Sequence, residues 1–380
     1  MKLEQDIELR VREEDYINLN PLQSGGRTYP ETRKAITSYV DGYSVCDWCS
    51  GALNCIRKPP IQSFLEDVAS FLGMDSALLT NGCREAKYAV MHSLASSKDF
   101  VVVDGNAHYS TFVAAERAGL RVEQLDSTGE PEYLVDPEAF GDKIREIKKI
   151  HGKTPKLAVL THVDGSYGNL VDAEKAASAC HREGVPLLLN TAYSSGRMRV
   201  DGSRLGVDFI AASCHKSWAA GGGNIGLLAA NGEWAEKVFR NSSDYEIKPL
   251  EILGCSTRGA AAVALLASYP KVKERVGKWG GEVDKARRLM AGLEELGVRQ
   301  LGEKPTNHDL NFLQSDVLYE ISQTHKKKNY YLYSELKKRG IIGIKPGLTR
   351  HFKISTYGKT EKQCDHILWA FRDIIEKHGP

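Results

Sequence analysis

Apolar positions change their spacing repeatedly between about residues 60 and 230. Residues 62–72 place five apolar side chains on one helical face, with helical spacing. Short runs that are apolar throughout follow: FVVVD at 100–104, LAVLT at 157–161, PLLLN at 186–190, DFIAA at 208–212 and IGLLAA at 225–230. Such runs are typical of strands buried on both faces, as in a parallel sheet covered by helices. With helical segments such as 172–182 between them, the pattern predicts an α/β fold.

After about residue 255 the pattern changes. Residues 259–268 and 282–296 have helical spacing, and the last fifty residues predict a smaller α+β domain. Its elements are a helix at 330–339, strands at 342–345 and 351–356, and a helix at 361–377. We therefore predict an N-terminal segment at 1–45 that packs on the domains, a large domain at 46–258, and a linking helix with a small domain at 259–380.

Composition limits the class of protein. Hydrophobic residues make up 42% of the chain and charged residues 26%, which are ordinary globular values. No apolar run approaches the roughly 18–20 residues of a membrane span. The start, MKLEQDIELRVREEDY, lacks the apolar stretch of a signal peptide. We expect a cytoplasmic protein whose eight cysteines are free, catalytic or metal-bound rather than disulfide-paired.

The charge balance says little about partners. The net charge of +2 neither demands nor excludes nucleic acid. Three local clusters are basic, and such clusters are usually solvated helix faces and less often mark an anionic partner. They are Lys326–Lys328, Lys337–Arg339, and the group of Lys271, Lys273 and Arg275.

Polar segments follow several of the apolar runs. In open α/β sheets, ligands bind outside the carboxyl ends of the strands. In TNGCREAKYAV (80–90), a helix begins near Cys83 and Arg84, and helix N-termini bind phosphate. In DGNAHYST (104–111), His108 would lie at the mouth of the sheet, where an aromatic ring can stack on a planar cofactor. Each segment alone is equally typical of an ordinary turn or a structural histidine.

Two further loops carry polar side chains. THVDGSYGN (161–169) brings His162, Asp164, Ser166 and Asn169 into one loop after a strand. In LLLNTAYSSG (187–196), Asn190 ends a very apolar strand. Leaving such a buried polar side chain without a partner costs roughly 1–3 kcal/mol, so a ligand atom is a candidate partner.

The segment DFIAASCHKSWAAGGGNIGLLAA (208–230) has the strongest chemical signal. A strand ends in Ser-Cys-His-Lys and a glycine run follows. Lys216, enclosed by Ser213, His215 and Trp218, would have its pKa lowered by desolvation and could act as a Schiff-base amine. The alternative is an exposed loop lysine.

Together these segments resemble the fold type I pyridoxal-phosphate enzymes of the aminotransferase and cysteine desulfurase superfamily, over nearly the whole chain. The S-x-H-K motif with its glycine-rich sequel is the most specific part. The resemblance implies a large, doubly wound, mostly parallel sheet domain, and it implies that Lys216 binds pyridoxal 5'-phosphate covalently. It implies these further roles: phosphate contacts from Cys83, Arg84, Ser213 and His215, a place for Cys214 in the cofactor site, ring stacking by His108, Asp164 near the cofactor's 3' oxygen, and Asn190 at the pyridine nitrogen.

Asn190 departs from the superfamily pattern. Most members have Asp there, which keeps the pyridine nitrogen protonated. An amide cannot hold that proton by charge, so the ring is expected to be a weaker electron sink. Such a ring suits loss of a leaving group from Cβ better than transamination.

The cysteines narrow the resemblance. A desulfurase needs a mobile catalytic cysteine, but Cys364 lies inside a predicted helix. Instead the chain has C-x2-C at Cys46 and Cys49, and Cys255 in LGCSTRGAA. With INLNPLQSGGRTYPE and SCHKSWAAGGG, these segments resemble the O-phosphoseryl-tRNA:cysteinyl-tRNA synthase family. The resemblance implies a β-replacement on phosphoserine esterified to a cysteine tRNA, giving Cys-tRNA and phosphate.

The same resemblance implies a homodimer with shared sites. Ser256 and Thr257 would reach the partner's cofactor phosphate, and Cys255 would meet Cys46 and Cys49 across the interface. Cations and donors for the departing phosphate would come from Arg84, His108, Arg27 and Lys353. Arg350 matches the region where relatives hold the carboxylate of the substrate. In this family that carboxylate is an ester to tRNA. Arg350 would then contact the substrate phosphate or the terminal adenosine, or it would lie on the surface, and these alternatives stay open.

Cys46, Cys49 and Cys255 would carry persulfide sulfur or ligate an iron–sulfur cluster. Structural zinc, with Cys55 as a fourth ligand, and simple packing are the alternatives. Cys180 and Cys214 lie in or beside apolar runs and are expected to pack. The synthetase that makes phosphoseryl-tRNA is an expected associate. Rival functions are a cysteine desulfurase or small-molecule β-lyase, and a cofactor-free scaffold that binds tRNA or a synthetase.

Overall fold

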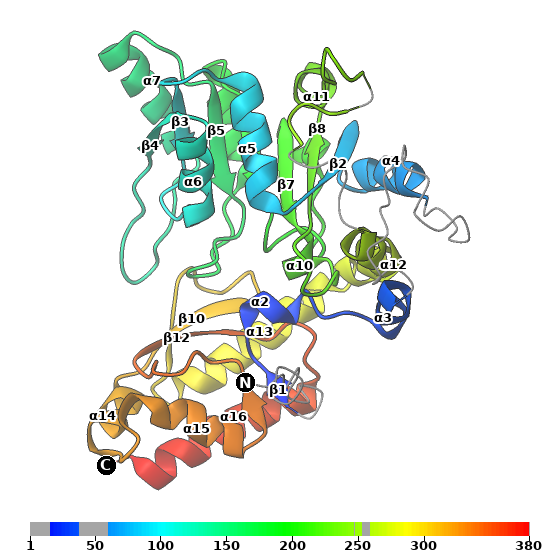
Figure 1. The fold of residues 1–380 in the computed structure, drawn as a ribbon. Coiled ribbons are helices and arrows are strands. Elements are labelled where there is room, and N and C mark those ends of the chain that lie inside the picture. Colours follow the sequence, from blue (N-terminus) through cyan, green and yellow to red (C-terminus); the bar gives the residue numbers. More distant parts are fainter. Residues whose placement is uncertain (1–15, 38–59, 247, 253–258, 380) are drawn as a thin grey trace, which may run out of the picture. The chain divides into compact units, whose positions relative to one another are not determined.

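The computed structural model describes residues 16–37, 60–246, 248–252 and 259–379. They form two compact units, each with its own hydrophobic core. The large unit comprises residues 25–280, and the small unit combines residues up to 24 with those from 281 onward (Figure 1). The predicted boundary at 258/259 thus differs from the observed division at 280/281. The reason is that the helix after residue 258 buries its apolar face in the core of the large unit.

The large unit is built on a seven-stranded sheet with the order β2-β8-β7-β6-β5-β3-β4. Strand β8 runs antiparallel to both of its neighbours, and the remaining pairs are parallel. The five predicted apolar strands are all confirmed, whereas β4 carries no such run and was not predicted. The strands are β2 (Ser76–Thr80), β3 (Phe100–Val103), β4 (Arg121–Gln124), β5 (Leu157–Thr161), β6 (Leu187–Asn190), β7 (Phe209–Ser213) and β8 (Gly226–Ala230).

Helices cover both faces of this sheet. Helices α4 (Ile61–Phe71), α7 (Ala139–His151), α8 (Ala173–Arg182) and α12 (Gly259–Val276) share one core cluster with alternate strand residues. Helices α5 (Cys83–Leu94), α6 (Tyr109–Arg117) and α11 (Gly232–Val238) lie on the other face, where α5 packs on β7 and β8 (Figure 1). Shorter helices are α3 (Pro30–Thr37), which packs on α12, α9 (Gly202–Leu205) and α10 (Cys214–Ser217).

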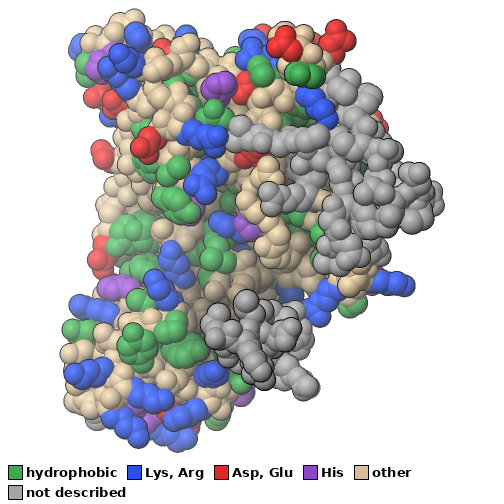
Figure 2. All heavy atoms as spheres, viewed as in Figure 1, with side chains coloured by type: hydrophobic (Ala, Val, Ile, Leu, Met, Phe, Trp, Pro, Cys, Tyr) green, Lys and Arg blue, Asp and Glu red, His purple; other side chains and the backbone are tan. Residues whose placement is uncertain are grey.

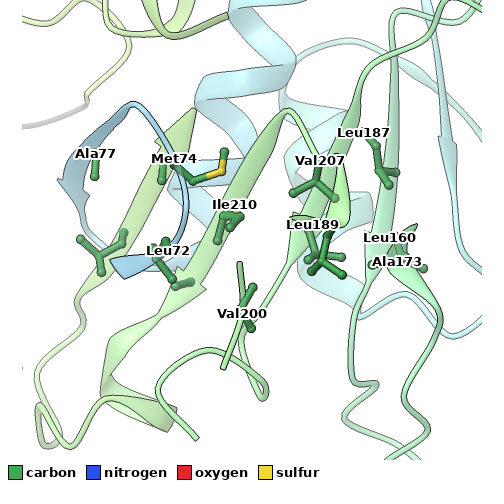
Figure 3. Packing of buried hydrophobic residues seen from close by; sticks show 14 of the residues in the cluster. Leu72, Met74, Ala77, Leu160, Ala173, Leu187, Leu189, Val200, Val207 and Ile210 are labelled. Carbon is green, nitrogen blue, oxygen red and sulfur yellow. The ribbon is translucent and has the colours of Figure 1, made fainter. Parts of the chain in front are cut away.

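The packing explains why the strands are apolar throughout. Leu187 and Leu189 point into the cluster shown in Figure 3 together with Ile210, whereas Leu188 between them is equally buried but lies outside that cluster. Successive side chains of a strand point to opposite faces, so both faces of β6 are covered. Polar residues therefore stand only at the last position of β5, β6 and β7, which are Thr161, Asn190 and Ser213.

The small unit contains an antiparallel sheet, β12-β10-β9, and a parallel pair, β1-β11. The strand predicted at 342–345 is corrected to β11 at Ile341–Ile342. Gly343, with φ +104° and a backbone close to Asn20, ends the strand. Its other elements are β1 (Ile17–Asn18), α2 (Pro21–Ser24), α13 (Trp279–Glu294), β9 (Arg299–Leu301), β10 (Leu310–Gln314), α14 (Asp316–Thr324), η2 (Lys328–Tyr330), α15 (Tyr331–Lys338), β12 (His351–Ser355) and α16 (Glu361–His378).

The described cysteines are all buried. Cys180 and Cys214 belong to the large core, which confirms that they pack, and Cys364 lies in α16. Within the described part of the chain, no helix combines the length and apolar character needed to cross a bilayer.

Candidate active site

Lys216 lies in the single helical turn α10, directly after β7. Its Nζ atom is 4.9 Å from the centroid of the Tyr193 ring, and within the described ranges it forms no hydrogen bond or ion pair. Burial lowers the pKa of the Lys216 ammonium, and the nearby Arg197 guanidinium acts in the same direction. The amine is thus held half-buried and easier to deprotonate than an exposed lysine, as a nucleophile requires.

A pair of glycines from the N-terminal part of the chain packs on the Lys216 turn. A Cβ atom on Gly26 would lie 2.0 Å from the carbonyl oxygen of His215, so only glycine fits there. The carbonyl of Gly25 accepts a hydrogen bond from the N–H of Ala219 at 3.0 Å. This close approach places the next residue, Arg27, beside the lysine turn. Its side chain is exposed and contacts no other described polar group.

The N-terminus of α5 is open. Its N-cap residue, Gly82, has φ +111°, and a Cβ there would lie 2.6 Å from Asn224 Oδ1. No described residue accepts a hydrogen bond from the backbone N–H of Cys83 or Arg84, and the Arg84 side chain is exposed. Unsatisfied N–H groups at a helix N-terminus, together with a neighbouring guanidinium, suit a phosphate group.

Asn190 ends β6 with its side chain buried and its orientation fixed. Its Oδ1 accepts from the Ala192 N–H and from the Cys83 thiol, each at 3.2 Å. Because a backbone N–H can only donate, the other end of the amide must be Nδ2, and it donates to no residue in the described segments. Burial raises the pKa of the Cys83 thiol, which therefore remains a protonated donor. The group that Asn190 offers is thus an N–H donor, and its contact with a ring nitrogen stays a prediction.

Asp164 is held by its own loop. One carboxylate oxygen accepts from the N–H groups of Ser166 at 2.8 Å and Tyr167 at 2.6 Å, and the other accepts from Asn169 at 3.1 Å. Burial raises the pKa of Asp164, while these backbone hydrogen bonds oppose the shift. The carboxylate therefore shapes the 164–169 turn, and its contact with a cofactor oxygen stays a prediction.

The remaining residues of the Ser-Cys-His-Lys motif contribute unequally. His215 Nδ1 donates to the Ile225 carbonyl at 3.1 Å, and Ser213 Oγ lies 3.2 Å from Nε2 of the same ring. The Cys214 side chain is in the core, and its N–H donates to Ile225 as well. Direct contacts of these three residues with a cofactor stay predictions.

His108 is the N-cap of α6, with its side chain accepting from the Ser110 N–H. Its Nδ1 also lies 2.8 Å from Ser110 Oγ. The segment 104–111 follows β3, so His108 lies at the carboxyl edge of the sheet that also ends in Asn190 and Ser213.

Several predicted residues lie outside the described ranges: Cys46, Cys49, Cys55, Cys255, Ser256 and Thr257. Arg350 belongs to the small unit, where it is exposed and forms an ion pair with Asp316 at 2.9 Å. Lys353 lies half-buried in β12. The structure therefore brings together the large-unit residues of the prediction and leaves the cysteine trio as a prediction.

Two residues that support the site, Asn224 and Arg275, are far along the chain from the segments they contact, and the sequence pattern does not predict their roles. Asn224 donates through Nδ2 to the Asn81 carbonyl and seats the turn before α5. Arg275 belongs to one of the basic clusters in the sequence, but it donates to the carbonyls of Gly25 and Gly196 and is structural. No local pattern marks either residue, because their partners are far away in the chain.

Two other features of the described residues resemble binding sites. A pocket of about 660 Å³ lies beside α8 and α9 and includes His162, but none of the residues assigned to the cofactor. His325, Glu335 and His378 of the small unit could offer metal ligands, but Lys338 and Arg339 already bind Glu335. Figure 2 shows Lys and Arg side chains gathered over this part of the small unit, around η2 and α15.

The described site fits pyridoxal phosphate on three independent counts: an amine at Lys216 that no described hydrogen bond or ion pair engages, an open helix N-terminus at Cys83, and an amide donor at Asn190. On a mostly parallel seven-stranded sheet, this combination defines a fold type I pyridoxal-phosphate enzyme. Solved structures agree on the fold. A Sphingomonas wittichii serine palmitoyltransferase has a TM-score of 0.73 at 16% identity, covering 96% of this chain and 89% of that one. A Thermococcus onnurineus cysteine desulfurase has a TM-score of 0.73 at 18% identity, covering 97% and 99%.

Closer relatives identify the family. Residues 71–376 match the family model described as O-phosphoseryl-tRNA(Sec) selenium transferase, SepSecS. The chain is 50% identical to the O-phospho-L-seryl-tRNA:Cys-tRNA synthase of Methanothermobacter thermautotrophicus, over 97% of both chains. It is 49% identical to that of Methanosarcina acetivorans, over 95% of this chain and 94% of the relative. A crystal structure of a SepCysS–SepCysE N-terminal domain complex matches with a TM-score of 0.92 and 44% identity, over 98% of both chains. The chain therefore belongs to the family of the O-phospho-L-seryl-tRNA:Cys-tRNA synthases, as its motifs predicted.

Proposed function

We propose that the protein converts O-phosphoseryl-tRNA(Cys) into cysteinyl-tRNA(Cys) by replacing the phosphate on Cβ with sulfur, using pyridoxal 5'-phosphate. The observation that carries this proposal is the unpartnered, half-buried Lys216 amine at the edge of a site that offers phosphate and ring-nitrogen contacts. The identity of about half of all residues to named synthases supports the substrate.

When bound, pyridoxal phosphate would supply an electron-accepting ring joined to the Lys216 amine. The N–H groups of Cys83 and Arg84 would hold its phosphate. Nδ2 of Asn190 would donate to its ring nitrogen, and His108 would cover the ring. Ser213, His215 and Asp164 would add the remaining contacts.

Lys216 is the base of the reaction. With its pKa lowered by burial, the amine can take the proton from the substrate Cα and later return it. The Cβ–O bond breaks and phosphate departs with the electron pair, so cations must meet it. Arg27 and Arg84 are exposed large-unit guanidinium groups without a described partner, which supports this role. Lys353 and Arg350 complete the proposed substrate contacts.

Asn190 tunes the reaction towards loss of phosphate. Because the Asn190 amide offers its Nδ2 as a donor, the ring nitrogen of a bound cofactor would stay unprotonated and the ring would draw electrons less strongly. Asn190→Asp should therefore increase transamination as a side reaction. Product analysis by mass spectrometry checks this, and an unchanged product profile would contradict it.

Sulfur reaches the site through Cys46, Cys49 and Cys255, as persulfide or through an iron–sulfur cluster that they ligate. In the persulfide route, the terminal sulfur bonds to Cβ and a second thiolate attacks the carrier sulfur. The product thiolate is released, and the two cysteines are oxidised to a disulfide that an external thiol must reduce. Free sulfide needs no such reduction.

The decisive experiment follows turnover of phosphoseryl-tRNA in the wild type and in single Cys46→Ala, Cys49→Ala and Cys255→Ala variants, with Cys55→Ala as the matched control. With a persulfide donor, the three variants should lose activity and the control should keep it. Activity that survives all three changes removes the proposed role of the trio. Turnover of free cysteine to alanine, without turnover of phosphoseryl-tRNA, would instead support the desulfurase alternative.

We also propose that the enzyme is a cytoplasmic homodimer with shared active sites, and that the synthetase that forms its substrate associates with it. Mixing Lys216→Ala and Cys255→Ala subunits tests the sharing. Mixed dimers would contain one site with both residues intact, so part of the activity should return. If every mixture stays inactive, each site is built from one chain.

A further inference from the structure

Lys87 in α5 is fully buried, yet no carboxylate pairs with it. Its side chain is 0% exposed, and its Nζ donates to Ser110 Oγ and Thr111 Oγ1, each at 2.8 Å. Among the residues that the structure describes, no Asp or Glu lies within ion-pair distance of it. Burying an ammonium without a counter-ion costs several kcal/mol. Such a position needs an explanation other than stability.

The two hydroxyls belong to the first turn of α6, which packs beside α5 (Figure 1). Ser110 Oγ is also 2.8 Å from Nδ1 of His108, and the Ser110 N–H donates to the same nitrogen at 3.3 Å. The chain of contacts therefore runs from Lys87 Nζ through Ser110 Oγ to His108 Nδ1. Its two hydrogen bonds keep the terminal nitrogens within about 6 Å of each other.

The direction of these hydrogen bonds follows from the donors. A lysine ammonium has only donors, so Ser110 Oγ accepts from it and has its single proton left to give. An acceptor in reach of that proton is His108 Nδ1 at 2.8 Å, which also accepts from the Ser110 N–H. A nitrogen that accepts two hydrogen bonds carries no proton. The neutral ring must then hold its proton on Nε2.

Charge acts in the same direction. A second positive charge on His108 would lie close to Lys87 and at the N-terminal end of α6, where the helix dipole disfavours a cation. Burial, together with Lys216 and Arg84, lowers the pKa of the Lys87 ammonium and so works against its charged form, whereas Cys83 and Asp104 favour that form. The two hydroxyl acceptors at 2.8 Å satisfy the charged form.

We propose that Lys87 is a positioning residue that acts through Ser110 to keep His108 neutral, with its proton on Nε2. Within the proposed function, on which this consequence rests, His108 would meet the departing phosphate as an N–H donor. Arg27 and Arg84 would then supply the positive charge and His108 the directed hydrogen bond.

The test measures the protonation of His108 directly, by 15N NMR of histidine-labelled, cofactor-free protein with the His108 signals assigned from a His108→Gln variant. Wild type should show one tautomer with the proton on Nε2. Lys87→Met and Ser110→Ala should both give a mixture that includes protonated Nδ1. Thr111→Val is the matched control, because it removes the other Lys87 contact and leaves the link to His108, so its His108 signals should match wild type.

Measurements of stability and of reaction rate distinguish a positioning role of Lys87 from a purely structural one. Lys87→Met removes a buried unpaired ammonium and should keep or raise the melting temperature, while kcat for phosphoseryl-tRNA falls about tenfold. Unchanged His108 signals in both Lys87→Met and Ser110→Ala would overturn the proposal. Failure of the wild type to use phosphoseryl-tRNA would refute the proposed function, whereas the NMR result would stand.

Discussion

Two regions of the molecule differ in whether their buried charged side chains have a partner of opposite charge. At the carboxyl edge of the large sheet, Lys216 and Lys87 are buried to different degrees without a carboxylate partner. In the small unit, Arg339 forms ion pairs with Glu335 at 2.9 Å and Asp373 at 2.5 Å, and all three side chains are largely buried. Unpaired charges destabilise a fold but remain available for a ligand, whereas paired charges hold a fold together. The first region is therefore expected to govern activity and the second stability.

The largest expected effect is that of Lys216→Ala. Turnover of phosphoseryl-tRNA should fall by at least about 1000-fold, because the covalent amine and the base are lost together. The free energy of unfolding of the cofactor-free protein should fall by no more than about 1 kcal/mol, because the amine has no described hydrogen bond or ion pair and loses only its contact with the Tyr193 ring. A chemical denaturation curve checks this, and a clear loss of stability would break the comparison.

Gly26→Ala should have the next largest effect, since the lysine turn is positioned by close packing rather than by charge pairs. Its Cβ would lie 2.0 Å from the His215 carbonyl oxygen, and we expect a loss of about 3 kcal/mol in unfolding free energy. Cofactor retained after dialysis should fall as well. Gly222→Ala, in the glycine run after the lysine, meets no atom within 4 Å and should behave like wild type. Equal behaviour of the two variants would show that the glycine contact does not position the turn.

Arg339→Met sharpens the other side of the comparison. It leaves Glu335 and Asp373 without their shared partner, and after allowance for solvent screening we expect a loss of about 2 kcal/mol in unfolding free energy. kcat should stay within about twofold of the wild-type value, because none of these three side chains belongs to the proposed site. A large fall in kcat with normal stability would reverse the assignment of the two regions.

The smallest effect is a pH dependence of stability. Burial alone would raise the pKa of Glu335, but Lys338 and Arg339 outweigh it and lower that pKa to about 2, from 4.5. A lowered folded-state pKa stabilises the protein above the unfolded value, and this contribution is lost as the pH falls from about 4.5 towards 2. In the Glu335→Gln variant, the free energy of unfolding should fall by about 1 kcal/mol less than in the wild type over this pH range, after allowance for solvent screening of the charges.

Denaturation curves at pH 3 and pH 6 measure the difference between Glu335→Gln and wild type. Glu274→Gln is the control, because Glu274 pairs only with exposed lysines on the surface of α12 and its neighbourhood. If both variants respond to pH alike, the buried network contributes nothing special.

The sequence by itself determined those features of the protein that depend only on residues close together in the chain. Strands β5 to β8 are apolar along almost their whole length because helices cover both faces of the sheet, and this pattern needs no knowledge of distant partners. The motif around Lys216 and the asparagine at the end of β6 could be assigned by resemblance, because each is a short contiguous segment with its own chemistry. The family followed from the same segments.

Only the tertiary structure decided how distant segments meet. Three features depend on contacts between residues far apart in the chain. They are the antiparallel direction of β8, the packing of Gly26 against the His215 carbonyl, and the inclusion of α12 in the large core. The same is true of Lys87, which sequence periodicity places merely on a helix and the structure places against Ser110 and Thr111 of another helix. Periodicity reports that a side chain is buried. It does not report which partner satisfies its charge, and that partner decides whether the side chain stabilises the fold or serves the site.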